Sequence, residues 1–144
     1  MPTGLKVRPF QDADRDQVEQ LWADVFPDDP PWNSPSVMID NKVKVQAELF
    51  LVAIMRDAVV GAVMAGFDGV RGWIHHLAVS ADHRLRGIAT ALVRAAEAGL
   101  REVGCPKVNL QIRATNTDVI AFYRRLGYAV EDRVSMGRHL RGAG

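Results

Sequence analysis

Cysteine is almost missing from this chain, since Cys105 is the only one among 144 residues. A single cysteine excludes a disulfide framework and the paired-cysteine motifs that bind zinc. Disulfide-poor chains are typical of reducing compartments. We therefore expect a cytoplasmic protein that carries no metal.

Long apolar runs and an excess of one charge are absent as well. No stretch approaches the roughly 20 apolar residues that span a bilayer. Met1–Phe10 contains Lys6 and Arg8 and lacks the apolar run of a signal peptide. The formal net charge is +1, which gives no general basis for binding nucleic acid. We expect neither a membrane nor a nucleic acid as partner.

The chain does contain the composition of an ordinary globular domain. Hydrophobic residues make up 48% of it and charged residues 24%, and a chain of this length can bury a sizeable core. No repeat, low-complexity tract or long linker interrupts it. Residues 1–144 are therefore predicted to form a single domain.

The N-terminal part predicts one strand and two helices. Leu5–Phe10 is expected to be a strand, and a helix begins at Gln11 or Asp12. The helix has an apolar stripe with helical spacing, made of Val18, Leu21, Trp22 and Val25. Prolines after it end the helix. Ser34 followed by Pro35 is typical of a helix start, and the second helix is expected over Ser36–Ala47.

The rest of the chain predicts a sheet with two further helices. Three strands are expected to form an antiparallel meander, at Leu49–Met55, Val59–Phe67 and Gly72–Val79. A helix over Arg86–Val103, a strand over Val108–Ile112, a helix over Asn116–Leu126 and one or two short strands within Tyr128–Leu140 follow. The order β-α-α-β-β-β-α-β-α-β predicts an α/β (α+β) fold, a mixed and mostly antiparallel sheet flanked by helices.

The segment Arg84–Thr90 joins a strand to the clearest helix and carries the chemical signal. The first turn of a helix has N–H groups without intrahelical partners and a partial positive charge, which together bind anions such as phosphate. Gly87 lets an anion approach the backbone closely. Arg84 and Arg86 are unfavourable at a helix start unless an anion is present. The alternative is a glycine that only shapes a tight junction.

The pattern Arg84-x-x-Gly87-x-Ala89 resembles the signature of the GNAT superfamily of acyl-CoA-dependent N-acetyltransferases. It follows an apolar Leu-Ala-Val strand and precedes a long helix, as in that family. Asn116 and the run Phe122-Tyr123-x-x-x-Gly127-Tyr128 resemble the family's second motif. The matching order of elements covers almost the whole chain, which looks most similar to small bacterial members related to ribosomal-protein and YpeA-like acetyltransferases.

The resemblance implies acetyl-CoA as cosubstrate and a set of residues that bind it. The backbone amides around the glycine would hold the pyrophosphate, those of Leu85, Arg86, Gly87, Ile88, Ala89 and Thr90. Backbone groups of Leu77, Ala78 and Val79 would run beside the pantetheine arm where two strands splay apart. Asn116 would hydrogen-bond that arm, and Tyr123 would lie near the sulfur.

The implied reaction is direct attack of a neutral amine on the thioester, with Tyr123 donating to the departing thiolate. A lysine-like amine has a pKa near 10.4 and must first lose a proton. Family members often place a glutamate on the fourth or fifth strand, whereas Gly72–Val79 carries His75 and His76 instead. Adjacent strand residues point to opposite faces, so at most one is expected to face the amine, and His75 is favoured. Structural histidines and a water chain that removes the proton are the alternatives.

The loop between the first two predicted helices commonly borders the acceptor groove in the GNAT family. Two features of this loop have ordinary explanations as well. Trp32 either lines the groove or, as we favour, packs onto the sheet as a hydrophobic staple. Asp28 and Asp29 either attract a cationic amine or belong to a solvated loop. The acceptor itself, a small molecule or a protein amino group, is not specified by the sequence.

The leading function is thus an acetyl-CoA-dependent N-acetyltransferase. A non-catalytic acyl-CoA-binding or sensing module is the second, supported by the missing glutamate and opposed by Tyr123. A generic nucleotide-binding α/β protein is the third, although its phosphate loop would follow the first strand. A homodimer formed through sheet edges or the tail is also open.

Overall fold

The computed structural model describes residues 2–141, and two compact units make up the chain, residues 1–111 and residues 112–144. The first unit holds β1 (Lys6–Pro9), α1 (Arg15–Val25), α2 (Pro35–Lys42), β2 (Phe50–Met55), β3 (Ala58–Phe67), β4 (Gly72–Val79), α3 (Ile88–Glu102) and β5 (Val108–Asn109). The second unit holds α4 (Thr117–Arg125). Among the described residues no helix is long and apolar enough to cross a membrane.

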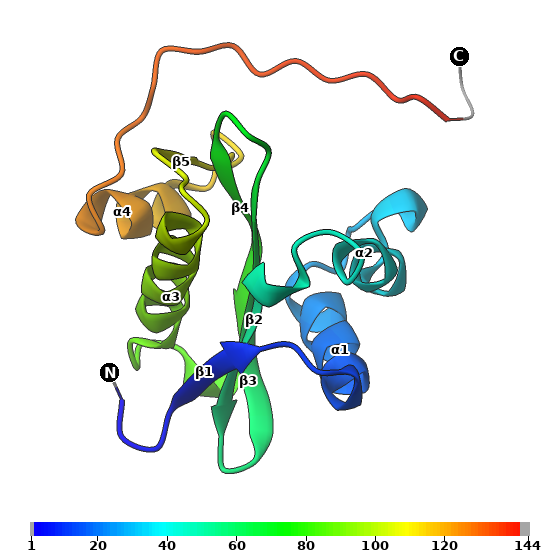
Figure 1. Cartoon of the computed structure of the whole chain (residues 1–144). Coiled ribbons are helices and arrows are strands. Elements are labelled where there is room, and N and C mark those ends of the chain that lie inside the picture. Colours follow the sequence, from blue (N-terminus) through cyan, green and yellow to red (C-terminus); the bar gives the residue numbers. More distant parts are fainter. Residues whose placement is uncertain (1, 142–144) are drawn as a thin grey trace. The chain divides into compact units, whose positions relative to one another are not determined.

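The first unit is built on one five-stranded sheet in the order β1-β2-β3-β4-β5. The pairs from β1 to β4 are antiparallel, and β5 joins β4 in parallel. This confirms the predicted meander and the predicted α/β class with a mostly antiparallel sheet. Figure 1 shows α1 and α2 on one face of the sheet and α3 on the other.

The core under α1 follows from the alternation of strand residues. Ala62 and Met64 of β3 point to this face, where they pack with Trp22 of α1 and Phe50 of β2. Ile39 of α2 completes the cluster and is fully buried. The opposite face of β3 packs closely against α3. A Cβ atom at Gly61 would lie only 2.9 Å from Leu92 Cδ1. Successive side chains of β3 point to opposite faces of the sheet, so this strand contributes to two separate apolar layers.

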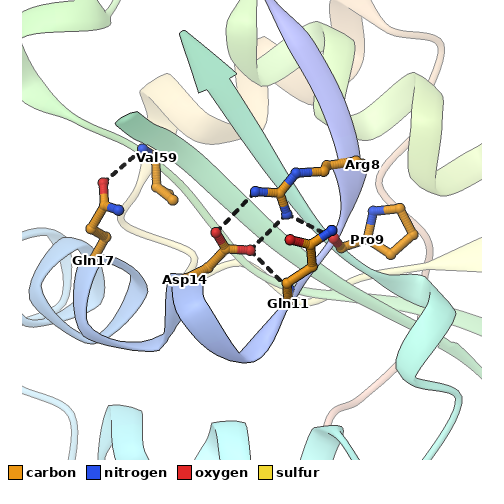
Figure 2. Close-up of polar contacts among 6 residues, drawn as sticks. All are labelled: Arg8, Pro9, Gln11, Asp14, Gln17 and Val59. Carbon is orange, nitrogen blue, oxygen red and sulfur yellow. Dashed lines mark hydrogen bonds and ion pairs between the residues drawn. The ribbon is translucent and has the colours of Figure 1, made fainter. Parts of the chain in front are cut away.

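The start of α1 is joined to β1 by a partly buried ion pair. Arg8 donates to both carboxylate oxygens of Asp14 (Figure 2). Its Nη1 lies 2.7 Å from Oδ2, and its Nη2 lies 3.0 Å from Oδ1. The backbone N–H of Gln11 also donates to Asp14, at 2.8 Å. The hydrogen bond from Arg8 holds the pKa of Asp14 below its usual value. Farther along, Gln17 accepts from the backbone N–H of Val59, which links α1 to β3.

The second helix is shorter than predicted, because it ends at Lys42 rather than at Ala47. Its last residue and the loop after it form hydrogen bonds to the end of β3 instead. Lys42 Nζ donates to the carbonyl of Ala65 at 2.5 Å, and the Gln46 side chain pairs with both backbone groups of Phe67. Gln46 itself has a left-handed φ of 51°, which is incompatible with a continuing helix.

The predicted strands beyond α3 are mostly wrong. β5 contains only Val108 and Asn109, not the expected run to Ile112. Within the described tail, residues 128–141 form no strand. Its alternating apolar residues are exposed, with Val134 at 87% and Met136 at 91%. A strand needs a neighbour to pair with, and residues 110–141 pair with no strand among the described residues.

In the second unit, α4 has the start and stop signals that the sequence indicated. The Asn116 side chain accepts from the Val119 N–H at 3.3 Å as an N-cap. Gly127 follows the helix with a φ of 98°, and the N–H of Tyr128 donates to the carbonyl of Tyr123. This pattern is a common glycine-dependent helix end.

Candidate functional site

The middle of β4 contains a bulge that changes which way its side chains point. Ala62 pairs with Ala78, but the next pair joins Met64 to His75, so two residues of β4 lie opposite one residue of β3. His76 has a φ of 52°, in the left-handed region that non-glycine residues rarely adopt. Such bulges re-aim side chains near functional sites.

Because of this bulge, both histidines lie on the face covered by α1 and α2. His75 pairs with Met64, whose side chain belongs to the core under α1, and paired residues share a face. His76 contacts two aromatic rings of α1, Trp22 and Phe26. The expectation that only one of the two faces this side is therefore wrong, since strict alternation fails where a residue is inserted.

The His76 side chain is fixed by contacts on several sides. Its ring meets Trp22 edge-on at 5.4 Å and Phe26 at 4.4 Å between centroids. Its Nε2 lies 2.9 Å from Oδ2 of Asp29, in the loop after α1. The carbonyl of His76 accepts from Trp22 Nε1 at 3.1 Å. Both His76 and Asp29 are largely buried, with side chains 22% and 17% exposed.

His75 has a different environment. It is exposed and stacks on Trp73, with centroids 6.5 Å apart and planes 19° from parallel. Partial desolvation lowers its pKa, and the positive charges of His76 and Lys42 lower it further. A lowered pKa keeps the imidazole neutral at pH 7, but it also makes it a weaker proton acceptor.

The loop between β4 and α3 leaves backbone N–H groups exposed. Leu85 and Gly87 have left-handed φ values of 63° and 79°, and α3 begins at Ile88. Within residues 2–141 nothing accepts a hydrogen bond from the N–H groups of residues 85–90, whereas the N–H of Ala91 already bonds to Gly87. Successive free N–H groups in such a turn form an anion-binding concavity.

The surroundings of this loop suit a large anion. Arg84, Leu85, Arg86 and Gly87 are exposed, and a side chain at Gly87 would meet only Pro2, at 3.9 Å. Ser80 Oγ pairs with His83 Nδ1 at 2.7 Å and so fixes the turn that precedes the loop. The site therefore offers room, positive charge and N–H donors, which fits a pyrophosphate.

The edge of β4 beside this loop is open within the first unit. β5 pairs only with Gly72 and Trp73, so the remainder of β4 has no strand neighbour on that side among the described residues. Leu77, Ala78 and Val79, which were predicted to run beside the pantetheine arm, lie in this open part. An open strand edge can take an extended ligand by hydrogen bonds to its main chain.

The two remaining predicted residues belong to the second unit. Asn116 uses its side-chain oxygen as the cap of α4. Tyr123 is buried, with 6% exposure, and its ring meets Phe122 and Tyr128 edge-to-face at 5.0 and 5.3 Å. Burial raises the pKa of Tyr123 to about 12, so the phenol keeps its proton at neutral pH.

Sequence reasoning missed the partnership of Asp29 and His76 and misplaced Trp32. Asp29 was weighed only as an attractor of amines, and nothing in the sequence links it to a residue 47 positions away. Trp32 is 58% exposed, so it is not a staple packed onto the sheet. Among the described residues, no three His, Cys, Asp or Glu side chains gather as metal ligands.

Comparison with known proteins gives a consistent result. A family model described as the acetyltransferase (GNAT) family matches residues 15–128. An acetyltransferase of Yersinia enterocolitica is 41% identical over 138 residues, which cover 94% of this chain and 96% of that protein. An acetyltransferase of Sodalis glossinidius is 41% identical over 132 residues, covering 90% and 91%.

Solved structures share the fold at lower identity. Ard1 from Thermoplasma volcanium superposes with a TM-score of 0.81 at 22% identity, covering 90% of this chain and 85% of that one. The aminoglycoside N-acetyltransferase AAC(6')-Iy, solved in complex with CoA, has a TM-score of 0.77 at 17% identity and 95% coverage of both chains.

Proposed function

Because this chain belongs to the GNAT family of acetyltransferases, we propose that it transfers the acetyl group of acetyl-CoA to a primary amine. The observation that supports this most is the run of unpartnered N–H groups at residues 85–90 beside the open edge of β4. A backbone cradle next to a free strand edge matches a ligand with a pyrophosphate and an extended amide-containing arm.

The residues present fit that cosubstrate. Leu85, Arg86, Gly87, Ile88, Ala89 and Thr90 would hold the pyrophosphate through their backbone amides. Arg84 and Arg86 would add charge at the rim, where both are exposed. Leu77, Ala78 and Val79 would pair with the arm, and Asn116 would donate to it through its amide nitrogen. Acetyl-CoA supplies the acetyl group as a thioester.

Tyr123 is assigned as the donor to the departing sulfur. A phenol with a pKa of about 12 remains protonated at neutral pH, whereas an ordinary thiol has a pKa near 8.5. Full proton transfer from Tyr123 to a thiolate is therefore uphill, and a hydrogen bond to the developing negative charge is the favoured contribution. A backbone N–H of β4 would stabilise the carbonyl oxygen in the same step.

The acceptor amine would approach from the face that carries the histidines. A cationic amine must lose a proton before it attacks, and His75, the base predicted from the sequence, shares this face with His76. Aliphatic amines, peptides with a free amino terminus, lysine-containing peptides and an aminoglycoside form a suitable acceptor panel. A cytoplasmic location and the absence of a metal remain predictions.

The test is acetyl transfer by the purified chain, followed by CoA thiol release and by mass spectrometry of the amine. Wild type is expected to acetylate at least one amine of the panel. Gly87→Glu is expected to lose this activity, because it places a charge and a side chain in the cradle. Gly69→Glu is the matched control, since Gly69 also has a positive φ, 98°, and open space around it, but lies at the other end of β4.

Two results would count against the proposal. Equal activity of Gly87→Glu and wild type would remove the cradle from the reaction. Tight binding of acetyl-CoA without acetylation of any amine would favour the alternative function, a non-catalytic acyl-CoA-binding module.

A further inference from the structure

We propose that His76, held by Asp29, is the group that takes the proton from the acceptor amine. This inference rests on the proposed function. It assigns the proton acceptor to a histidine other than the one favoured from the sequence, and it gives Asp29 the part of a positioning residue.

The position of His76 supports the assignment. His76 lies in the bulge and directly precedes Leu77, Ala78 and Val79 in the part of β4 whose edge is open. A thioester arm bound along that edge would bring the acetyl carbon close to the bulge. A left-handed φ at a histidine costs free energy, and the hydrogen bond from Trp22 to the His76 carbonyl holds this backbone in place.

The orientation of the ring leaves one nitrogen available. The Asp29 carboxylate can only accept, so the Nε2 of a neutral His76 carries the hydrogen toward it. Nδ1 then has the free lone pair. It has no partner among residues 2–141 and is not one of their buried unpartnered polar atoms, so it keeps some contact with solvent. A carboxylate on the far nitrogen also stabilises the imidazolium that forms.

Electrostatics favour His76 over His75 for a cationic acceptor. Lys42 from α2 is a cationic neighbour of His75, which has no carboxylate partner within the described chain. His76 faces Asp29 from the loop after α1, while α1 itself contributes the uncharged rings of Trp22 and Phe26. An ammonium group is therefore attracted to Asp29 and repelled from the surroundings of His75.

The protons of the reaction balance with this assignment. Before attack, Nδ1 of His76 takes one proton from the ammonium group, directly or through a water, and releases it to solvent. The amine nitrogen then forms a bond to the acetyl carbon while the carbon–sulfur bond breaks. Of the two protons left on nitrogen, one stays on the amide and the other ends on the CoA thiol.

His76→Gln separates this role from a structural one. The glutamine amide can still donate to Asp29, so the link between the loop and β4 is kept, but an amide does not accept a proton at neutral pH. The probes are n-butylamine, whose pKa resembles that of lysine near 10.4, and glycinamide, whose α-amino pKa is nearer 8. His139→Gln, the same change at an exposed histidine of the tail, is the control.

The expected result is a loss of kcat/KM that depends on amine basicity. With n-butylamine at pH 7, His76→Gln should lose about 100-fold, and the deficit should shrink as pH rises toward the pKa of the amine. With glycinamide the loss should stay below about tenfold, because more of this amine is already neutral. Asp29→Asn should shift kcat/KM in the same sense by a smaller factor, and His139→Gln should match wild type.

A measurement without acetyl transfer tests the same geometry. Nitrogen-15 NMR of labelled histidines, assigned with His76→Gln, should show neutral His76 with its hydrogen on Nε2, and Asp29→Asn should weaken that preference. The hydrogen on Nδ1 would overturn the proposal. So would an equal loss with both amines, an unchanged rate, or a larger loss in His75→Gln. Wild type that acetylates neither these probes nor any amine of the panel would remove the proposed function, and the proton acceptor with it.

Discussion

The loop after β4 and the helix-covered face of β4 are neighbours in sequence, yet they offer ligands different groups. The loop presents backbone N–H groups and two exposed arginines, while its one large apolar side chain, Leu85, is fully exposed. The face presents side chains, His75 and His76 with Asp29 beside them. A shared cosubstrate can be held by backbone alone, whereas a particular acceptor and its proton need particular side chains.

The largest expected effect comes from the residue assigned to the departing sulfur. Tyr123→Phe should lower kcat about 100-fold, while the dissociation constant of acetyl-CoA stays within about threefold of wild type, because the lost hydrogen bond forms mainly as the bond to sulfur breaks. Rapid-quench kinetics and calorimetry measure the two quantities separately. Equal losses in kcat and in the affinity for acetyl-CoA would instead make Tyr123 a residue that binds the cosubstrate.

A second expected effect concerns the scaffold that carries the acceptor face. Asp14→Asn should lower the free energy of unfolding by about 2 kcal/mol, because it weakens charged hydrogen bonds between Arg8 and the buried Asp14. The pKa of Asp14 is lowered in the folded chain. Its contribution should thus be complete above the unfolded pKa near 3.9 and should be lost as pH falls through the folded pKa.

Urea unfolding at pH 7 and at a series of lower pH values measures this contribution. Asp12→Asn is the control, because the Asp12 side chain is 99% exposed and lies 4.0 Å from Arg15; its stability should match wild type within about 0.5 kcal/mol. If both variants unfold at the same urea concentration, the ion pair does not hold α1 against the sheet.

The smallest expected effect is on the pKa of His75. Lys42→Met removes a positive charge that lowers this pKa, so the NMR titration midpoint of His75 should rise toward its usual value. Partial desolvation is the larger cause and persists, so the rise should be incomplete. Lys44→Met, at an exposed position of the same segment, should leave the midpoint in place. A midpoint that moves equally in both variants would show that the charge of Lys42 acts only at long range.

The contrast between the regions also explains what could be predicted from the sequence. The cradle is local, because a strand, a basic loop, Gly87 and a helix follow one another within a few residues. The meander and α3 were predicted for the same reason, from periodicity and glycine or proline stops. Their physical causes lie within each segment.

The parts that sequence reasoning missed depend on distant partners. His76 of β4 pairs with Asp29 of the loop after α1, which is far away in the sequence. The bulge lies in the run Ile74–Val79, which contains no glycine or proline that would indicate it. One or two short strands were predicted within Tyr128–Leu140, but residues 128–141 of the described chain form none. The second helix loses its last turn because Lys42 and Gln46 bond to β3.

The most direct test of the backbone cradle is calorimetric titration of acetyl-CoA into wild type, Gly87→Glu and Gly69→Glu, with ATP and dephospho-CoA as comparison ligands. Gly69→Glu makes the same chemical change at another glycine with a positive φ, so it corrects for charge and backbone strain. We predict that wild type and Gly69→Glu bind acetyl-CoA alike and that folded Gly87→Glu binds at least about 100-fold more weakly. Equal affinity in all three chains would contradict the assignment of this loop as the cosubstrate site.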